Sequence, residues 1–102
     1  MIRHVFLWKV AKGANAQEII RILDELPGKV PGIRTWSRGR HQGPPGDSGG
    51  LWDGALISDF DSWEALARYS NHPFHSEVVS RLIPMFADRA VCDFELPVGE
   101  QK

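Results

Sequence analysis

Cysteine is nearly absent from this sequence, since Cys92 has no second thiol to pair with inside the chain. No apolar run approaches the roughly 20 residues that a membrane-spanning helix requires. The apolar stretch of a signal peptide is also missing ahead of the first predicted strand. We therefore expect a cytoplasmic protein without disulfides and without a membrane partner.

An excess of charge of one sign is missing as well. The sequence has 12 Lys and Arg residues against 13 Asp and Glu, which gives a formal net charge of −1. Proteins that bind nucleic acid or lipid surfaces usually carry a basic patch or stripe, whereas the basic residues here are scattered among acidic ones. No nucleic-acid partner is expected.

What the sequence does contain is the composition of a small globular protein. Its 102 residues are 42% hydrophobic and 25% charged, which suits one soluble domain and is too little chain for two. The residues after Pro97 are mostly polar. The sequence therefore predicts a single domain over residues 1–97 and a polar C-terminal tail at 98–102.

Hydrophobic periodicity divides the chain into alternating strands and helices. Short segments rich in alternating apolar residues predict strands at 1–10, 33–40, 52–60 and 89–96. Apolar residues at helical spacing, each series stopped near a proline, predict helices at 15–26, 61–69 and 74–83. The run 41–50 is rich in Gly, Pro, Asp and Ser and is expected to be a loop.

The order β-α-β-β-α-β is that of the ferredoxin-like α+β fold, a four-stranded antiparallel sheet with helices on one face. The first predicted strand is apolar on both faces, because Phe6 and Trp8 alternate with Val5 and Leu7. Helices can cover only one of these faces, and a bare apolar face is most simply buried against an identical sheet. We therefore expect a homodimer, a dimeric α/β barrel, paired through the face that bears Val5 and Leu7.

Four segments resemble the stress-responsive dimeric α/β barrel family, often called the Dabb domain. They are residues 1–9 (MIRHVFLWK), 27–33 (PGKVPGI), 69–75 (YSNHPFH) and 88–94 (DRAVCDF). The HPxH segment combined with the first and last strands is fairly specific for that family. The resemblance implies the fold and the dimer described above. It implies no single activity, because members range from plant stress proteins and accessory proteins to a polyketide cyclase.

The resemblance also implies a cavity between sheet and helices that holds three candidate catalytic residues, His4, Tyr69 and His75. In the polyketide cyclase the residues that match His75 and Tyr69 act as general base and substrate-positioning group, and the one that matches His4 lies nearby. An imidazole can take a proton from a carbon next to a carbonyl, and a phenol can hydrogen-bond the oxyanion that forms. The candidate substrate-binding residues are Phe6, Trp8, Leu56, Phe60, Trp63 and Phe86.

Each of these residues also has a structural interpretation. His75 could cap a helix or hold the adjoining helix break together, and His4 could be a histidine with satisfied hydrogen bonds. Tyr69 could pack its ring and direct its hydroxyl to solvent. If bulky residues such as Trp8 and Phe86 fill the cavity, the protein would be a non-enzymatic domain that works through its dimer.

The sequence therefore leads to two hypotheses for the function. The first is a protein of unassigned activity that binds a small apolar or aromatic carbonyl compound inside each subunit. The alternative is a cyclase-like or lyase-like enzyme that uses His75 and Tyr69, and neither hypothesis requires a cofactor. Haem chemistry, known from other dimeric α/β barrels, would need an axial ligand, for which His75 is the candidate. No metal site is expected, because His72 and His75 lack a third ligand at a defined spacing.

Two further patterns carry little weight. Residues 46–50 (GDSGG) match the serine loop of trypsin-like proteases, but that fold needs two barrels and a matching histidine segment, so we interpret the match as chance. Arg34, Arg38 and Arg40 alternate along the second predicted strand. They are consistent with an exposed edge kept soluble by charge or, alternatively, with an anion site at the mouth of the barrel.

Overall fold

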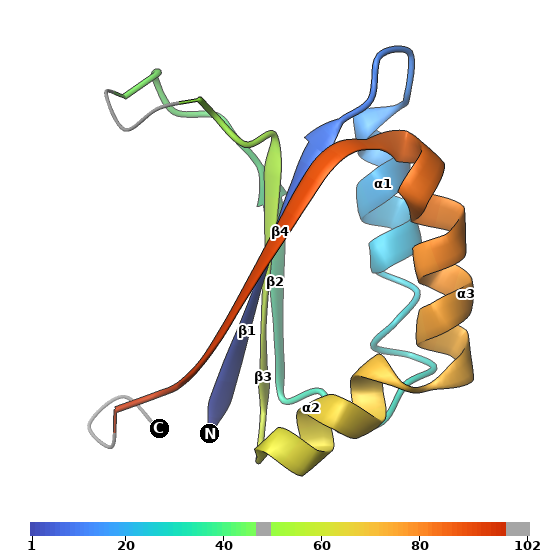
Figure 1. The fold of residues 1–102 in the computed structure, drawn as a ribbon, viewed down its shortest axis with the longest axis vertical. Coiled ribbons are helices and arrows are strands. Elements are labelled where there is room, and N and C mark those ends of the chain that lie inside the picture. Colours follow the sequence, from blue (N-terminus) through green and yellow to red (C-terminus); the bar gives the residue numbers. More distant parts are fainter. Residues whose placement is uncertain (47–49, 98–102) are drawn as a thin grey trace.

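The structure is a computed structural model that describes residues 1–46 and 50–97. Four strands form one antiparallel sheet in the order β2-β3-β1-β4, and the helices lie along one of its faces (Figure 1). The strands are β1 (Ile2–Val10), β2 (Thr35–Arg40), β3 (Gly54–Phe60) and β4 (Phe86–Glu95). The helices are α1 (Ala16–Leu23), α2 (Trp63–Ser70) and α3 (Pro73–Leu82), and a 3-10 turn follows at Ile83–Met85.

This arrangement confirms the predicted ferredoxin-like α+β fold, with differences at the ends of elements. β2 begins at Thr35 and not at residue 33. β4 begins at Phe86 and not at residue 89, because Phe86 pairs with Val10 beyond a shift in register at Lys9. No helix in the described part of the chain is long and apolar enough to cross a membrane. The predicted tail at 98–102 lies outside the described residues.

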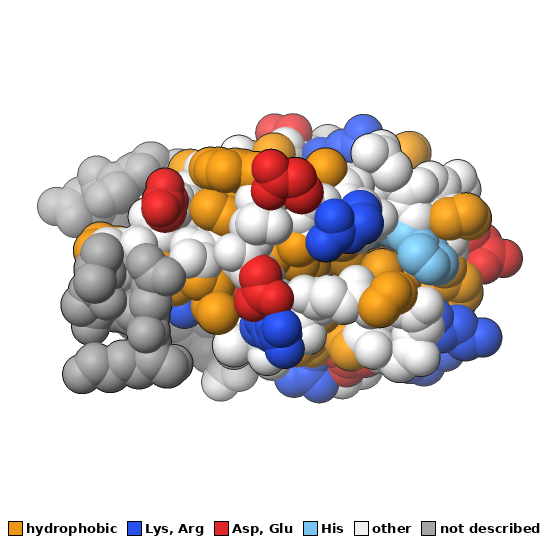
Figure 2. Space-filling view, turned by 90° about the horizontal axis from the view of Figure 1, so that it is seen from below, with side chains coloured by type: hydrophobic (Ala, Val, Ile, Leu, Met, Phe, Trp, Pro, Cys, Tyr) orange, Lys and Arg blue, Asp and Glu red, His pale blue; other side chains and the backbone are white. Residues whose placement is uncertain are grey.

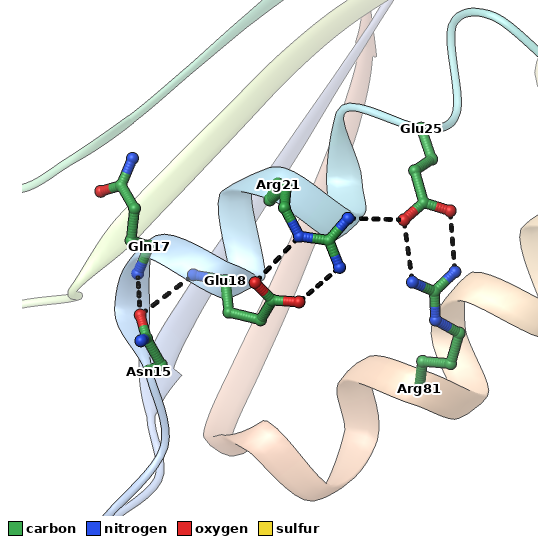
Figure 3. A network of polar contacts seen from close by, with 6 residues as sticks. All are labelled: Asn15, Gln17, Glu18, Arg21, Glu25 and Arg81. Atoms are coloured by element: carbon green, nitrogen blue, oxygen red, sulfur yellow. Dashed lines mark hydrogen bonds and ion pairs between the residues drawn. The ribbon is translucent and has the colours of Figure 1, made fainter.

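The first helix begins where the sequence predicts, but it ends three residues earlier than predicted. Asn15 caps α1, since its side-chain oxygen accepts hydrogen bonds from the backbone N–H groups of Gln17 (2.9 Å) and Glu18 (3.1 Å; Figure 3). The helix ends at Leu23 and not at residue 26, because the N–H of Leu26 bonds the carbonyl of Leu23, three residues back. Leu26 nevertheless stays buried in the core.

The core lies between the sheet and the helices. Trp8 and Phe60 from the sheet and Val78 from α3 are completely buried there. Complete burial of a side chain such as Phe or Val contributes on the order of 1.5–3 kcal/mol to stability. The helix-facing side of the sheet is therefore covered by the chain itself.

Within the described ranges, no helix lies over the other face of the sheet (Figure 1). The strand register places Val5 of β1 beside Ile57 of β3 and Cys92 of β4, and Leu7 follows on the same face of β1. The side chains of Val5 and Leu7 are only partly buried within the single chain. An apolar strip thus runs across the middle of the uncovered face.

Ion pairs connect α3 with α1 and with the turn that follows α1. Glu25 accepts two hydrogen bonds from the guanidinium of Arg81, each 2.8 Å long (Figure 3). Arg21 joins the same network through Glu18 and through a longer contact of 3.5 Å with Glu25. An ion pair that remains partly exposed contributes little to the stability of the protein. The effect of these pairs is to fix the spacing of the two helices that lie over the sheet.

The end of the molecule at which β1 begins shows no dominant charge. Acidic and basic side chains alternate there with hydrophobic ones (Figure 2). A nucleic-acid footprint would require basic residues gathered on one surface. This face does not provide one.

Candidate functional site

A cavity of about 440 Å³ lies between the helix-facing side of the sheet and helices α1 and α3. Small-molecule sites have volumes of roughly 300–1,000 Å³, so the space is large enough for a ligand. Its wall is mainly apolar. The aliphatic residues that α1, the turn after α1, β3 and α3 contribute to it are Leu23, Leu26, Leu56, Val78, Val79 and Leu82. The fold therefore leaves an open apolar space inside one subunit.

Polar side chains gather at one end of this cavity, where His4, Tyr69, His75 and Asp93 contribute to the wall. His4 and Asp93 face each other on β1 and β4, and His4 Nδ1 lies 2.5 Å from Asp93 Oδ1. The Tyr69 ring lies near both histidines, with ring centroids 6.2 Å from His4 and 4.7 Å from His75. The three residues predicted from the sequence thus converge on one site.

The break between α2 and α3 positions two of these residues. Tyr69 belongs to the last turn of α2, and His75 belongs to the first turn of α3. His72 caps α3, because its Nδ1 accepts a hydrogen bond of 3.0 Å from the N–H of Phe74, and Pro73 occupies the first helical position. Capping is therefore the role of His72, which leaves the His75 side chain free to reach the cavity.

His75 is partly buried beside the cavity. This burial lowers the pKa of His75 below its usual value, and the nearby His4 lowers it further. A hydrogen bond with the backbone of Ser70 acts in the opposite direction. The imidazole is therefore mostly neutral at pH 7, the form in which one ring nitrogen can accept a proton.

Tyr69 is almost fully enclosed, with 2% of its surface exposed. Burial raises the pKa of Tyr69, so its phenol stays protonated at neutral pH. The Tyr69 ring packs against Phe60, with ring centroids 4.9 Å apart. No residue in the described ranges hydrogen-bonds the Tyr69 hydroxyl, so this donor is available to a ligand.

The structure divides the six candidate substrate-binding residues into two groups. Phe6, Leu56 and Phe86 line the cavity. The rings of Phe6 and Phe86 pack edge to face, with centroids 5.6 Å apart. Together these three residues supply part of the apolar wall.

The other three candidates lie elsewhere. Trp8 is fully buried in the core against Gly54 and does not close the cavity. Phe60 lies behind Tyr69 and supports its ring. Trp63 is the first residue of α2 and is 51% exposed, because the buried side of that helix is formed by other residues, Ala65, Leu66 and Tyr69.

Two charged cavity residues were not predicted from the sequence, Asp93 and Arg89, both on β4. A charged residue on a strand usually indicates a solvent-facing position, so neither residue was predicted to line the cavity. The alternation of β4 could have placed them on one face. Their relation to His4 depends on the register between the first and last strands, which the sequence does not reveal.

Of the three arginines along the second strand region, two have partners. Arg34 pairs with Asp61 at 2.6 Å, and Arg38 pairs with Asp24 through two contacts of 2.7 Å. These pairs lower the pKa of both carboxyl groups. Arg34 and Arg38 are thus engaged within the chain, which favours the interpretation of a charged edge over an anion site.

Among the described residues, no three His, Cys, Asp or Glu side chains gather as a metal site would require. Within the GDSGG run, residues 47–49 lie outside the described residues.

Comparison with solved structures shows the same fold in proteins from several organisms. A dimeric ferredoxin-like protein of unknown function from Thermobifida fusca is 28% identical, with a TM-score of 0.77 over 93% of this chain and 90% of that one. An Arabidopsis thaliana protein is 22% identical, with a TM-score of 0.85 over 95% and 96% of the two chains. The hydroxynitrile lyase of Passiflora edulis is 18% identical, with a TM-score of 0.82 over 95% and 94%.

Sequence comparison identifies a family with this fold. The profile of the Stress responsive A/B Barrel Domain, Dabb, matches residues 2–96. No curated protein matches the chain.

Proposed function

Because the chain belongs to the stress responsive A/B barrel domain (Dabb) family, we propose that it works as a homodimer whose subunits each bind a small apolar carbonyl compound. We further propose that His75 and Tyr69 move a proton at the carbon next to that carbonyl. The observation that carries this proposal is the convergence of His4, Tyr69 and His75 at one end of an open apolar cavity.

The shape and lining of the cavity support an apolar ligand. Leucine, valine and phenylalanine side chains provide most of the wall and offer no hydrogen bonds. Polar groups are confined to a few positions, which is the usual pattern of small-molecule sites. A ligand with an apolar body and one carbonyl group matches this distribution, with its carbonyl at the histidine end.

The proton transfer uses two groups in their neutral forms. His75 accepts a proton from the carbon next to the carbonyl, and the electron pair of the broken C–H bond forms the carbon–carbon double bond of an enolate. The negative charge moves to the carbonyl oxygen, which accepts a hydrogen bond from the Tyr69 hydroxyl. The imidazolium exchanges this proton with solvent and then returns a solvent-derived proton to the same carbon, so that the base is regenerated and no cofactor is consumed.

His4 and Asp93 have a supporting role in this scheme. Asp93 accepts a hydrogen bond from His4 Nδ1 and so fixes the orientation of the imidazole ring. The same contact directs the other ring nitrogen of His4 away from Asp93. His4 is then a second polar contact for the bound carbonyl compound.

The uncovered sheet face supports the homodimer. Val5, Leu7, Ile57 and Cys92 form an apolar strip that a second copy would cover with the same residues. The related Thermobifida fusca protein is described as dimeric. In such a dimer the two cavities lie on the outer sides of the paired sheets.

The test is exchange of hydrogen for deuterium at the carbon atoms next to the carbonyl of 2-octanone in heavy water, followed by NMR. The native protein should accelerate this exchange, and the His75→Gln variant should lose the acceleration. Tyr69→Phe should reduce it by about 10²–10³-fold, the usual effect of removing one oxyanion donor.

A matched control is His41→Gln, since His41 is an exposed histidine outside the cavity. This variant should exchange as fast as the native protein. Equal exchange with and without His75 would refute the catalytic part of the proposal.

A further inference from the structure

The cavity wall contains one charged side chain that the proposed proton transfer does not use. Arg89 lies on β4 opposite Trp8 of β1 and contributes to the cavity wall. It is an exposed residue, and no residue within 1–46 or 50–97 forms an ion pair with it. Other arginines of this chain, such as Arg34 and Arg38, have carboxylate partners. Arg89 therefore keeps its full capacity to bind an anion.

Arg89 lies far from the histidines along the same wall. Asp93 follows it by four residues on β4, and both residues line the cavity. A strand rises by about 3.4 Å per residue, so the two backbone positions are about 14 Å apart. The arginine and the histidine cluster thus mark opposite ends of one elongated site.

The wall between the two ends is apolar. Phe6 of β1 and Val91 of β4 pair with each other across the strands, and Phe86 packs on Phe6. All three residues line the cavity. A chain of methylene groups could lie against them without leaving a polar group unpaired.

The charges at the two ends of the cavity also determine the orientation of an anionic ligand. Asp93 places a carboxylate beside His4 at the histidine end, where a second anion would be repelled. Arg89 offers a planar guanidinium at the other end, which is suited to bind a carboxylate through two hydrogen bonds. An anionic ligand is therefore favoured in one direction only.

We propose that the cavity selects carbonyl compounds that carry a carboxylate at their far end, with Arg89 as the residue that determines this specificity. The carboxylate binds Arg89, the apolar chain lies along the wall, and the carbonyl lies beside Tyr69 and His75. This inference rests on the proposed function, because it concerns the substrate class of the same cavity.

The experiment compares two matched probes, 7-oxooctanoate and its neutral amide, 7-oxooctanamide. Binding of each is measured by calorimetry at pH 8, where His75, whose pKa is lowered by burial, is neutral. The native protein should bind the carboxylate about tenfold more tightly than the amide, which corresponds to about 1.4 kcal/mol. Raised salt should weaken this preference, because the arginine is exposed.

Three variants separate the role of Arg89 from a general effect of charge. Arg89→Gln should bind both probes with the affinity that the native protein has for the amide. Arg89→Lys should keep part of the preference, since it keeps the charge and loses the planar fork. Arg68→Gln removes the same charge from α2, outside the cavity, and should behave as the native protein does.

The outcomes distinguish this inference from the proposed function. If the native protein binds both probes equally, or if Arg89→Gln keeps the preference for the carboxylate, the specificity role of Arg89 is overturned while the cavity remains a carbonyl site. If neither probe binds the native protein, both the inference and the proposed function fail.

Discussion

The indole ring of Trp8 occupies the space directly beside Gly54, so that a methyl group on Gly54 would come within 2.2 Å of the ring. Trp8 lies on β1 and Gly54 is the first residue of β3, and the two are paired across the strands. Only hydrogen on the glycine allows the largest side chain of the core to lie flat against the sheet. Trp8 is thus held in the core and is not one of the residues that line the neighbouring cavity.

Gly54→Ala should therefore destabilise the protein. The added methyl group forces the rigid indole to move within a packed core, and overpacking of this kind typically costs about 1–3 kcal/mol. Urea denaturation measures the effect. Gly39→Ala is the matched control, because nothing lies within 4 Å of its added methyl group in β2. Equal stability of the two variants would contradict this account of Trp8.

Asp59→Asn should also destabilise the protein, through loss of an ion pair. Asp59 is 2% exposed and accepts hydrogen bonds from Arg3 (2.9 and 3.0 Å) and from the Thr35 hydroxyl (2.7 Å). Hydrogen bonds to charged groups contribute about 1.5–3 kcal/mol, and chemical denaturation at pH 7 should show a loss in this range.

The same carboxylate predicts a dependence on acid. The hydrogen bonds from Arg3 lower the pKa of Asp59 in the folded protein. Its contribution to stability is therefore complete above the pKa of the unfolded chain and is lost as the pH falls through the lower folded value. Thermal melting from pH 6 to pH 2 should show a steeper decline for the native protein than for Asp59→Asn. Parallel curves would count against this role.

His75 should make the protein less stable in mild acid. Because burial lowers the pKa of His75 from 6.5, the unfolded chain binds its proton at a higher pH than the folded protein does. The free energy of unfolding should then decrease as the pH falls below about 6.5 and level off below the folded pKa. His75→Gln should remove this part of the slope, as denaturation at closely spaced pH values would show. A slope that survives the substitution must come from other groups.

Leu7→Glu should convert the proposed dimer into a monomer. In the proposed interface, the carboxylate would be buried near the same carboxylate of the second copy. The loss of hydration and the repulsion between the two charges would destabilise the dimer. Light scattering after gel filtration gives the mass, and circular dichroism checks the fold. Trp63→Glu places the same charge on exposed α2 and should remain dimeric. A dimeric Leu7→Glu would show that another surface forms the interface.

Much of the fold could be predicted because its signals are local. Asn15 is followed by a helical pattern, and the alternation around Phe6 identifies the first strand and its two apolar faces. The helix break at Pro73 is a local signal as well. These features depend on neighbours a few residues away, whereas the expectation that Tyr69 and His75 lie beside a cavity came from the family resemblance.

The remaining features depend on register and packing between distant segments. His4 and Asp93 are 89 positions apart, and their contact exists because β1 and β4 pair without a shift at that point. No local sequence pattern around Trp8 or around Gly54 predicts that these two residues pack against each other. The exposure of Trp63 depends on which side of α2 meets the sheet. None of these relations follows from hydrophobic periodicity.

β1 serves two surfaces at once, because His4 and Phe6 face the cavity while Val5 and Leu7 face away from it. A deletion or insertion of a single residue within this strand would exchange the two faces, since successive side chains point in opposite directions. The histidine would then enter the uncovered face and a valine would enter the cavity. A single substitution in β1 therefore affects one of the two surfaces, whereas a change in the length of the strand disrupts both.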